Sequence, residues 1–218
     1  MSNYTLSLIS PIPATQRERN AAAANTGDDA VMMARFLAGD DAAFAELFDR
    51  HNQRLYVYCL KLVGDTAHAE DITQEMWERV IRMRRNPQEV HTPIAFFLRI
   101  VRNLCINHVK RTRHTVSLGT LPESALPAEE RRERSEMEDM VDQALAELPF
   151  EYREVLVLNA YCGYRFDEIA TMMGKSPEAI WMRASRARAR LRQTVMSMRE
   201  TEMERSSARH EANLEAYS

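Results

Sequence analysis

Apolar residues recur every three to four positions along two long blocks of this 218-residue chain, residues 28–111 and 136–194. That spacing is typical of amphipathic helices, and neither block shows the strict alternation of a half-buried strand. Residues 1–27 are polar and alanine-rich, whereas residues 195–218 are charged. We therefore predict an all-α protein of two small helical domains, with a disordered N-terminal tail at 1–27 and a C-terminal tail of frayed or disordered helix at 195–218.

The segment between the two helical blocks has the amino-acid composition of an interdomain linker. Residues 112–135, "TRHTVSLGTLPESALPAEERRERS", contain two prolines, a glycine and a run of charged residues. Such residues interrupt helices and keep a segment solvated. We therefore expect a flexible linker between the domains.

The end of the second block has the helix stop and start signals of a helix-turn-helix. A short helix, "RFDEIATMMG", is closed by Gly174, after which Ser176 offers an N-cap and Pro177 occupies the first helical position. A short helix, a tight turn and a longer capped helix form the unit whose second helix enters the DNA major groove. An ordinary helical hairpin inside a bundle is the alternative interpretation.

A helical wheel separates the side chains of this second helix into a core face and an outward face. Six basic residues and one acidic residue lie between Lys175 and Arg192, which favours contact with phosphates over a merely solvated face. The predicted core face consists of Ile180, Ala184, Ala187 and Leu191. The outward and flanking positions that we assign to DNA contact are Ser176, Glu178, Trp181, Met182, Arg183, Ser185, Arg186, Arg188 and Arg190.

In the first block, a helix beginning near Asp65 has an acidic face. Between Leu62 and Glu78 there are five acidic residues and no lysine or arginine. The core face is supplied by Ala69, Ile72, Met76 and Val80, which leaves the opposite face free. That free face, which is either a partner surface or an ordinary solvated one, contains Asp71, Gln74, Glu75 and Glu78.

The next helix, which we place after Thr92 and Pro93, combines aromatic, basic and amide side chains on one face. Single-stranded DNA favours such a mixture, because rings stack on bases, cations contact phosphates and amides bind base edges. The residues of this face are Phe96, Arg99, Asn103, Asn107 and Lys110.

Composition narrows the possible classes of protein. The formal net charge is −3, which is unusual for a protein that binds DNA without help. No apolar run approaches the roughly 20 residues of a membrane span, and the N-terminus does not have the pattern of a signal peptide. The three cysteines lack metal or redox spacing, so we expect buried thiols. These features indicate a cytoplasmic protein with no membrane insertion, no metal and no cofactor.

Both blocks resemble one family. "FAELFDRHNQRLYVYCLKLVGDTAHAEDITQEMWERV" with "AFFLRIVRNLCINHVKR" resembles region 2 of the extracytoplasmic-function (ECF) sigma factors of the sigma-70 superfamily. "LAELPFEYREVLVLNAYCGYRFDEIATMMGKSPEAIWMRASRARARLR" resembles their region 4. The resemblance implies a region 2 helical bundle and a region 4 helix-turn-helix. It also implies a dissociable subunit of bacterial RNA polymerase that recognises promoters.

The resemblance also assigns roles to the surfaces. Asp71, Gln74 and Glu75 match positions that dock on the clamp helices of the polymerase β′ subunit. Asn103 and Asn107 match amides that recognise and open the minus-ten element, and the loop "RRNPQEVHT" would capture a flipped base. Region 4 would read the minus-thirty-five element and touch the β flap. An anti-sigma factor is a further expected partner. Docking on polymerase explains the acidic balance, because the enzyme supplies much of the phosphate-neutralising surface.

The chain departs from the family pattern just before Arg183, where Trp181 and Met182 replace a basic residue and a small polar one. Two further functions stay open: a helix-turn-helix regulator that binds an operator without polymerase, and a sigma-like protein that only titrates an anti-sigma factor. No phosphate-binding loop, HExxH motif or nucleophile elbow is present, so we do not expect an enzyme.

Overall fold

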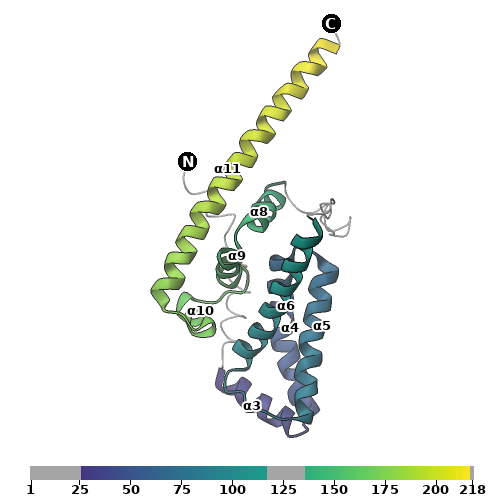
Figure 1. Cartoon of the computed structure of the whole chain (residues 1–218), viewed down its shortest axis with the longest axis vertical. Coiled ribbons are helices and arrows are strands. Elements are labelled where there is room, and N and C mark those ends of the chain that lie inside the picture. The colour runs from purple at the N-terminus through teal and green to yellow at the C-terminus, as the bar shows by residue number, and fades with distance from the viewer. Residues whose placement is uncertain (1–25, 117–135, 217–218) are drawn as a thin grey trace.

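A computed structural model describes residues 26–116 and 136–216, and across these two ranges the regular secondary structure is helical throughout. The predicted all-α class with two helical domains is confirmed (Figure 1). Most of the predicted N-terminal tail and most of the predicted linker lie outside the described residues.

The first domain is a bundle of four helices. They are α3 (Thr26–Leu37), α4 (Asp41–Val63), α5 (Thr66–Arg82) and α6 (Pro93–Val116), with a short 3₁₀ turn η1 (Met83–Arg85) after α5. Large apolar side chains from all four helices are excluded from solvent, and this burial stabilises the bundle. The largest include Phe36, Leu47, Leu55, Met76 and Phe97.

Side-chain caps fix where α4 and α5 begin. The Asp40 carboxylate accepts hydrogen bonds from the amides of Ala42 and Ala43 at 3.0 and 3.2 Å. Gly64 ends α4 with a φ of 79°, a left-handed conformation that a side chain would strain. Asp65 then caps α5 by accepting from the His68 amide at 2.8 Å. The chain thus reverses in two residues, and α5 packs beside α4.

The second domain contains α8 (Glu136–Glu147), α9 (Phe150–Leu156), a π-helical turn η2 (Val157–Tyr161), α10 (Phe166–Met173) and α11 (Pro177–Ala216). Gly174 closes α10 with a φ of 62°, and the Ser176 hydroxyl accepts a hydrogen bond from the Ala179 amide at 3.2 Å. The predicted helix-turn-helix is therefore formed by α10 and α11. Its predicted core face, Ile180, Ala184, Ala187 and Leu191, is buried.

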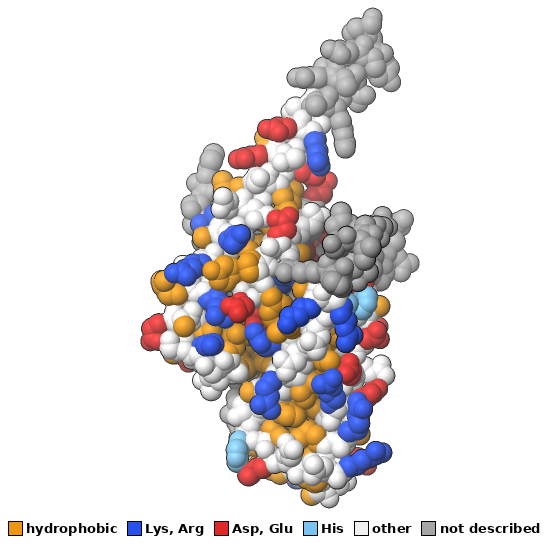
Figure 2. All heavy atoms as spheres, in the orientation of Figure 1, with side chains coloured by type: hydrophobic (Ala, Val, Ile, Leu, Met, Phe, Trp, Pro, Cys, Tyr) orange, Lys and Arg blue, Asp and Glu red, His pale blue; other side chains and the backbone are white. Residues whose placement is uncertain are grey.

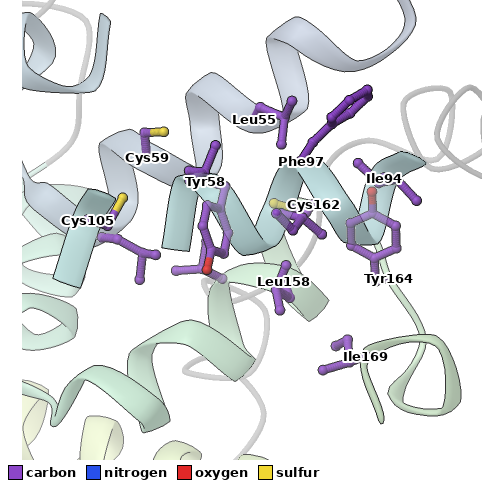
Figure 3. Close-up of a cluster of buried hydrophobic side chains, with 14 of the residues drawn as sticks. Leu55, Tyr58, Cys59, Ile94, Phe97, Cys105, Leu158, Cys162, Tyr164 and Ile169 are labelled. Atoms are coloured by element: carbon purple, nitrogen blue, oxygen red, sulfur yellow. The ribbon is translucent and has the colours of Figure 1, made fainter. Parts of the chain in front are cut away.

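The two domains pack against each other, and α4 contacts α8, α9 and η2. Figure 3 shows the junction, where Leu55 and Tyr58 of α4 face Leu158 and Cys162 of the second domain. Buried apolar residues of both domains form one continuous cluster. All three cysteines are free and buried, as predicted.

Two helices are longer than their sequence pattern predicted. Helix α6 continues to Val116, so the first five residues of the predicted linker, 112–116, are helical. Helix α11 continues to Ala216 through most of the predicted C-terminal tail, and Val195 is buried. The first domain likewise begins slightly earlier than residue 28, because α3 starts at Thr26.

Across the part of the chain that the structure describes, none of the helices combines the length and the apolar character that crossing a membrane requires.

Candidate functional surfaces

The acidic surface of α5 comprises Asp71, Gln74, Glu75 and Glu78, and all four side chains are exposed. The helix turns its opposite face inward, where Ala69, Ile72, Met76 and Val80 are buried as predicted. Because the apolar face is already packed, the acidic surface has no role in holding the bundle together. It is available to a partner.

Pairs within the helix organise part of the acidic surface. The Arg79 guanidinium lies 2.7 Å from the Glu75 carboxylate, and Arg82 lies 3.5 Å from Glu78. These side chains are about half exposed, so solvent screens the pairs and each adds little stability. A partner that supplies better-placed cations can therefore compete for these carboxylates.

The α6 surface comprises Phe96, Arg99, Asn103, Asn107 and Lys110. Phe96 is half-buried, and the other four side chains are exposed. The Arg99 guanidinium lies over the Phe96 ring, 5.5 Å from its centroid. The structure thus brings an aromatic ring, two cations and two amides onto one face, as the helical wheel predicted.

A pocket of about 290 Å³ adjoins the start of this surface. It is lined by residues 88–92 of the loop before α6, by Ala95, Phe96 and Arg99 of α6, and by Met172 of α10. The predicted base-capture loop therefore does border a hollow beside the aromatic ring. Met172 was not expected there, since it belongs to the other domain.

The α11 surface comprises Ser176, Glu178, Trp181, Met182, Arg183, Ser185, Arg186, Arg188 and Arg190. Ser176, Glu178, Ser185, Arg186 and Arg190 are exposed, and the indole of Trp181 and the side chain of Met182 are 56% and 45% exposed. Figure 2 shows basic side chains over the face formed by α6 and the first half of α11.

At the head of α11, hydrogen bonding stabilises a negative charge. The backbone amide of Glu178 and the Ser176 hydroxyl both hydrogen-bond the Glu178 carboxylate and lower its pKa below the ordinary value. A carboxylate in the first turn also interacts favourably with the helix dipole. Glu178 therefore stays ionised at neutral pH.

Two arginines of the α11 surface are held by partners inside the protein. Arg183 is paired with Glu151 of α9 at 3.4 Å, and its side chain is only 22% exposed. Arg188 donates to the Asn159 side chain at 3.0 Å and lies over the Phe166 ring. In this structure Arg186 and Arg190 face solvent more openly than Arg183 and Arg188.

Sequence reasoning missed the residues that join the two domains. The Glu154 carboxylate of α9 accepts hydrogen bonds from the Tyr58 phenol at 2.8 Å and from Arg102 of α6 at 2.7 Å. Arg54 of α4 donates to the Tyr164 phenol at 2.9 Å. The partners are between 52 and 110 positions apart, so local periodicity carries no signal for them.

Three charged residues are buried at this junction, Arg54, Arg153 and Glu154. Glu154 is 1% exposed, and one of its carboxylate oxygens has no hydrogen-bond partner among the described residues. Burial and the neighbouring Glu154 carboxylate raise the pKa of the Tyr58 phenol well above its ordinary value, so Tyr58 stays a hydrogen-bond donor. At the edge of the junction, Lys61 of α4 pairs with Asp142 of α8 at 2.6 Å.

Comparison with known families matches both domains separately. The family model of Sigma-70 region 2 matches residues 47–115, and the family model of Sigma-70, region 4 matches residues 138–191. The two matches together cover more than half of the chain.

Curated relatives match across both domains. The RNA polymerase sigma factor CarQ of Myxococcus xanthus is 30% identical over 165 residues, covering 75% of this chain and 95% of the relative. The ECF RNA polymerase sigma factor SigM of Mycobacterium tuberculosis is 30% identical over 164 residues, covering 75% of this chain and 82% of the relative.

Solved structures share the fold. CnrH, determined in complex with the cytosolic domain of CnrY, superposes with a TM-score of 0.60 at 22% identity, covering 78% of this chain and 98% of that one. The sigma factor RpoE of Bartonella quintana, determined in complex with the anti-sigma factor NepR, superposes with a TM-score of 0.56 at 23% identity, covering 70% and 96%.

Proposed function

The chain belongs to the sigma-70 family, among its ECF sigma factors, and from this premise we propose that its three surfaces divide the work of initiation. As such a factor it binds bacterial core RNA polymerase, directs it to specific promoters and supports the initiation of transcription.

The acidic surface of α5 docks on the clamp helices of the β′ subunit. Its support is the combination of exposure and charge: Asp71, Glu75 and Glu78 project from a helix whose apolar face is fully occupied. The weak intrahelical pairs with Arg79 and Arg82 can be exchanged for cations of the partner.

The α6 surface recognises the minus-ten element and helps to open it. In this proposal Phe96 stacks on bases, Asn103 and Asn107 bind base edges, and Arg99 and Lys110 contact phosphates. The support is that Phe96 is half-buried and the other four side chains are exposed on the same face of α6. The part of the adjoining pocket that belongs to the first domain, residues 88–92 with Ala95, Phe96 and Arg99, receives an extruded base from the melted strand. Extrusion costs a few kcal/mol, which stacking and the contacts of the pocket offset.

The α11 surface reads the minus-thirty-five element as duplex DNA, with α11 as the recognition helix of the helix-turn-helix. Arg186 and Arg190 are exposed for phosphates or base edges. The same domain contacts the β flap of polymerase. Arg183 and Arg188 join the DNA contacts when their present partners, Glu151 and Asn159, are exchanged for phosphates.

The observation that carries the proposal is the separation of charge. An acidic face on α5 and basic faces on α6 and α11 stand on different helices, each backed by packed core. The chain as a whole is acidic, so it gains DNA affinity once both domains are seated on polymerase and act at high effective concentration.

In vitro transcription tests the proposal. Core polymerase is incubated with a genomic promoter library, with and without the protein, and transcripts are mapped at their 5′ ends. Transcripts that appear only with the protein and share two upstream elements support the function. Tight, sequence-specific operator binding by the protein alone, without any new transcript, would identify a stand-alone regulator instead.

An anti-sigma factor completes the proposed set of partners. Its support is indirect: the solved relatives CnrH and RpoE were determined bound to CnrY and to the anti-sigma factor NepR. We expect the protein to act in the cytoplasm and without catalysis of its own. In the transcription assay, such a partner would abolish the transcripts, and excess protein would restore them.

A further inference from the structure

Two consecutive large apolar side chains are exposed on the recognition helix. Trp181 and Met182 are 56% and 45% exposed, whereas the other strongly exposed large hydrophobic residues of the described chain occur singly. Single exposed hydrophobic residues are common and need no explanation. A consecutive Trp–Met pair at the beginning of a helix that faces DNA is a different matter, since it places apolar surface where polar contacts are expected.

The surroundings of the pair define what it can contact. Lys175, Arg186 and Arg190 are exposed on the same helix or immediately before it, and Glu178 is the one acidic residue between positions 175 and 190. The excess of positive charge favours a polyanion as the partner of this face. Ile180 and Ala184 anchor the opposite side of the helix in the core, with no exposed surface. Met182 therefore projects away from the protein, one helical turn after Glu178 and one turn before Arg186.

Duplex DNA offers one apolar group on its major-groove base edges, the C5 methyl of thymine. A methionine thioether is flexible and polarisable, and it adapts to such a small apolar target. We propose that Met182 reads thymine methyl groups in the minus-thirty-five element, with Trp181 as the neighbouring apolar wall that excludes water from the contact. This specificity rests on the proposed function of α11.

The free energy of the contact between Met182 and a thymine methyl group can be approximated. Covering one methyl group stabilises a complex by the transfer free energy of about one methylene, which corresponds to roughly a fourfold change in affinity. Replacing thymine by uracil removes only the methyl group and leaves every hydrogen-bonding atom in place. Uracil substitution therefore isolates the apolar contact from all polar readout.

The experiment uses holoenzyme assembled from core polymerase and the full-length protein, on the promoter identified by transcript mapping. Each thymine of the minus-thirty-five element, on either strand, is replaced by uracil in turn, and the dissociation constant is measured. We expect at least one position at which uracil weakens binding about fourfold. With Met182→Ala, binding to the thymine promoter weakens by the same factor, and uracil at that position has no further effect.

Met196→Ala is the matched control. Met196 is also exposed, at 53%, and lies on the same helix fourteen residues further on. That spacing is about 21 Å at a rise of 1.5 Å per residue, beyond the roughly 12 Å width of the major groove. Met196→Ala should therefore keep the full sensitivity to uracil.

Three results would overturn the inference: no uracil position that matters, a uracil effect that persists undiminished in Met182→Ala, or a minus-thirty-five element without A·T pairs. In each of these cases the unmodified promoter is still transcribed, so the proposed function stands. Absence of any promoter-specific transcript, in contrast, would remove the proposed function itself before this test begins.

Discussion

The phenol oxygen of Tyr58 lies 2.8 Å from the carboxylate of Glu154, although the two residues are 96 positions apart and belong to different domains. Arg102 approaches the same carboxylate oxygen at 2.7 Å. Glu154 is almost completely buried, and these two donors offset part of the cost of burying its charge, although both reach one oxygen and the other has no partner among the described residues. This shared carboxylate is one of the polar contacts that join the domains, beside the buried apolar cluster that both domains form.

Tyr58→Phe should loosen the contact between the domains. The ring keeps its packing, but Glu154 loses a donor, at a cost of about 1–3 kcal/mol for a buried charged acceptor. Energy transfer between dyes at Glu46→Cys on α4 and Ser197→Cys on α11 should show a longer and broader distance distribution. Both positions are exposed, whereas the three native cysteines are buried and react poorly.

Tyr152→Phe supplies the control for this measurement, because it removes the same hydroxyl from a half-buried tyrosine two residues from Glu154. An identical distance distribution in wild type and Tyr58→Phe would contradict the assigned role of the junction.

The distance between the two dyes in the wild-type protein should also rise on the promoter. Elements centred about 25 base pairs apart are roughly 85 Å apart at 3.4 Å per pair. In the packed arrangement Phe96 of α6 and Met172 of α10 line the same pocket, so we expect the domains to separate when both elements are bound at once.

The double variant Asp71→Ala/Glu75→Ala should bind core polymerase at least tenfold more weakly. Both side chains are exposed, so the free energy of unfolding, measured by thermal denaturation, should change by no more than about 0.5 kcal/mol. Glu46→Ala/Asp49→Ala removes the same charge from exposed positions on α4 and should bind normally. Equal affinities for both double variants would show that overall charge, not the acidic surface, attracts polymerase.

Arg186→Ala should weaken promoter binding by about 1–3 kcal/mol if the guanidinium contacts a base edge, with the loss confined to promoters that carry the preferred minus-thirty-five base. If the guanidinium contacts a phosphate instead, the variant should lose affinity equally for all promoters. The slope of log affinity against log salt concentration should then fall by about one. Binding titrations at several salt concentrations distinguish the two outcomes. Arg199→Ala, exposed further along α11, should leave binding unchanged.

Asp65→Ala should lower the stability of the first domain by about 1 kcal/mol at neutral pH through loss of the α5 cap. Partial burial would raise the pKa of Asp65, but hydrogen bonds from the His68 amide and ring outweigh it and lower the pKa below 3.8. The ionised cap therefore stabilises above about pH 4, and its contribution disappears as pH falls through the folded-state pKa.

Chemical denaturation between pH 3 and 7 checks this dependence. The difference between wild type and Asp65→Ala should be largest at pH 7 and shrink in acid. Asp65→Asn keeps a capping oxygen and should retain most of the stability at every pH. A constant difference across the range would exclude the carboxylate charge as the cause.

Local rules were enough to predict most of the fold. Ser176 was predicted as a cap from its residue type, the start of a helix was placed near Asp65, and helical spacing correctly assigned buried faces to Ile72 and Ile180. These features depend on neighbours within four positions, which the sequence displays directly. The continuation of α11 also left a trace, since Leu191, Val195 and Met198 keep the helical period past residue 194.

Features that depend on distant residues could not be predicted in the same way. Nothing local to Arg183 or Arg188 indicates that Glu151 and Asn159 will hold them. Met172 lines the pocket beside Phe96 only because the domains meet. The α6 and α11 surfaces were assigned to DNA from their own residues, but the docking role of the acidic α5 surface depended on family resemblance, because an exposed acidic face looks alike whether it binds a partner or only water.

Helix α11 is 40 residues long, so its axis extends about 60 Å at 1.5 Å per residue. The recognition residues occupy its first third, and residues 199–207 of the remainder are all exposed. A rotation of about 10° of the helix in the DNA groove would sweep its far end through roughly 10 Å. The position of a probe near that end would therefore report the angle between α11 and the promoter DNA, because a small change in angle displaces the end of a long helix by a large distance.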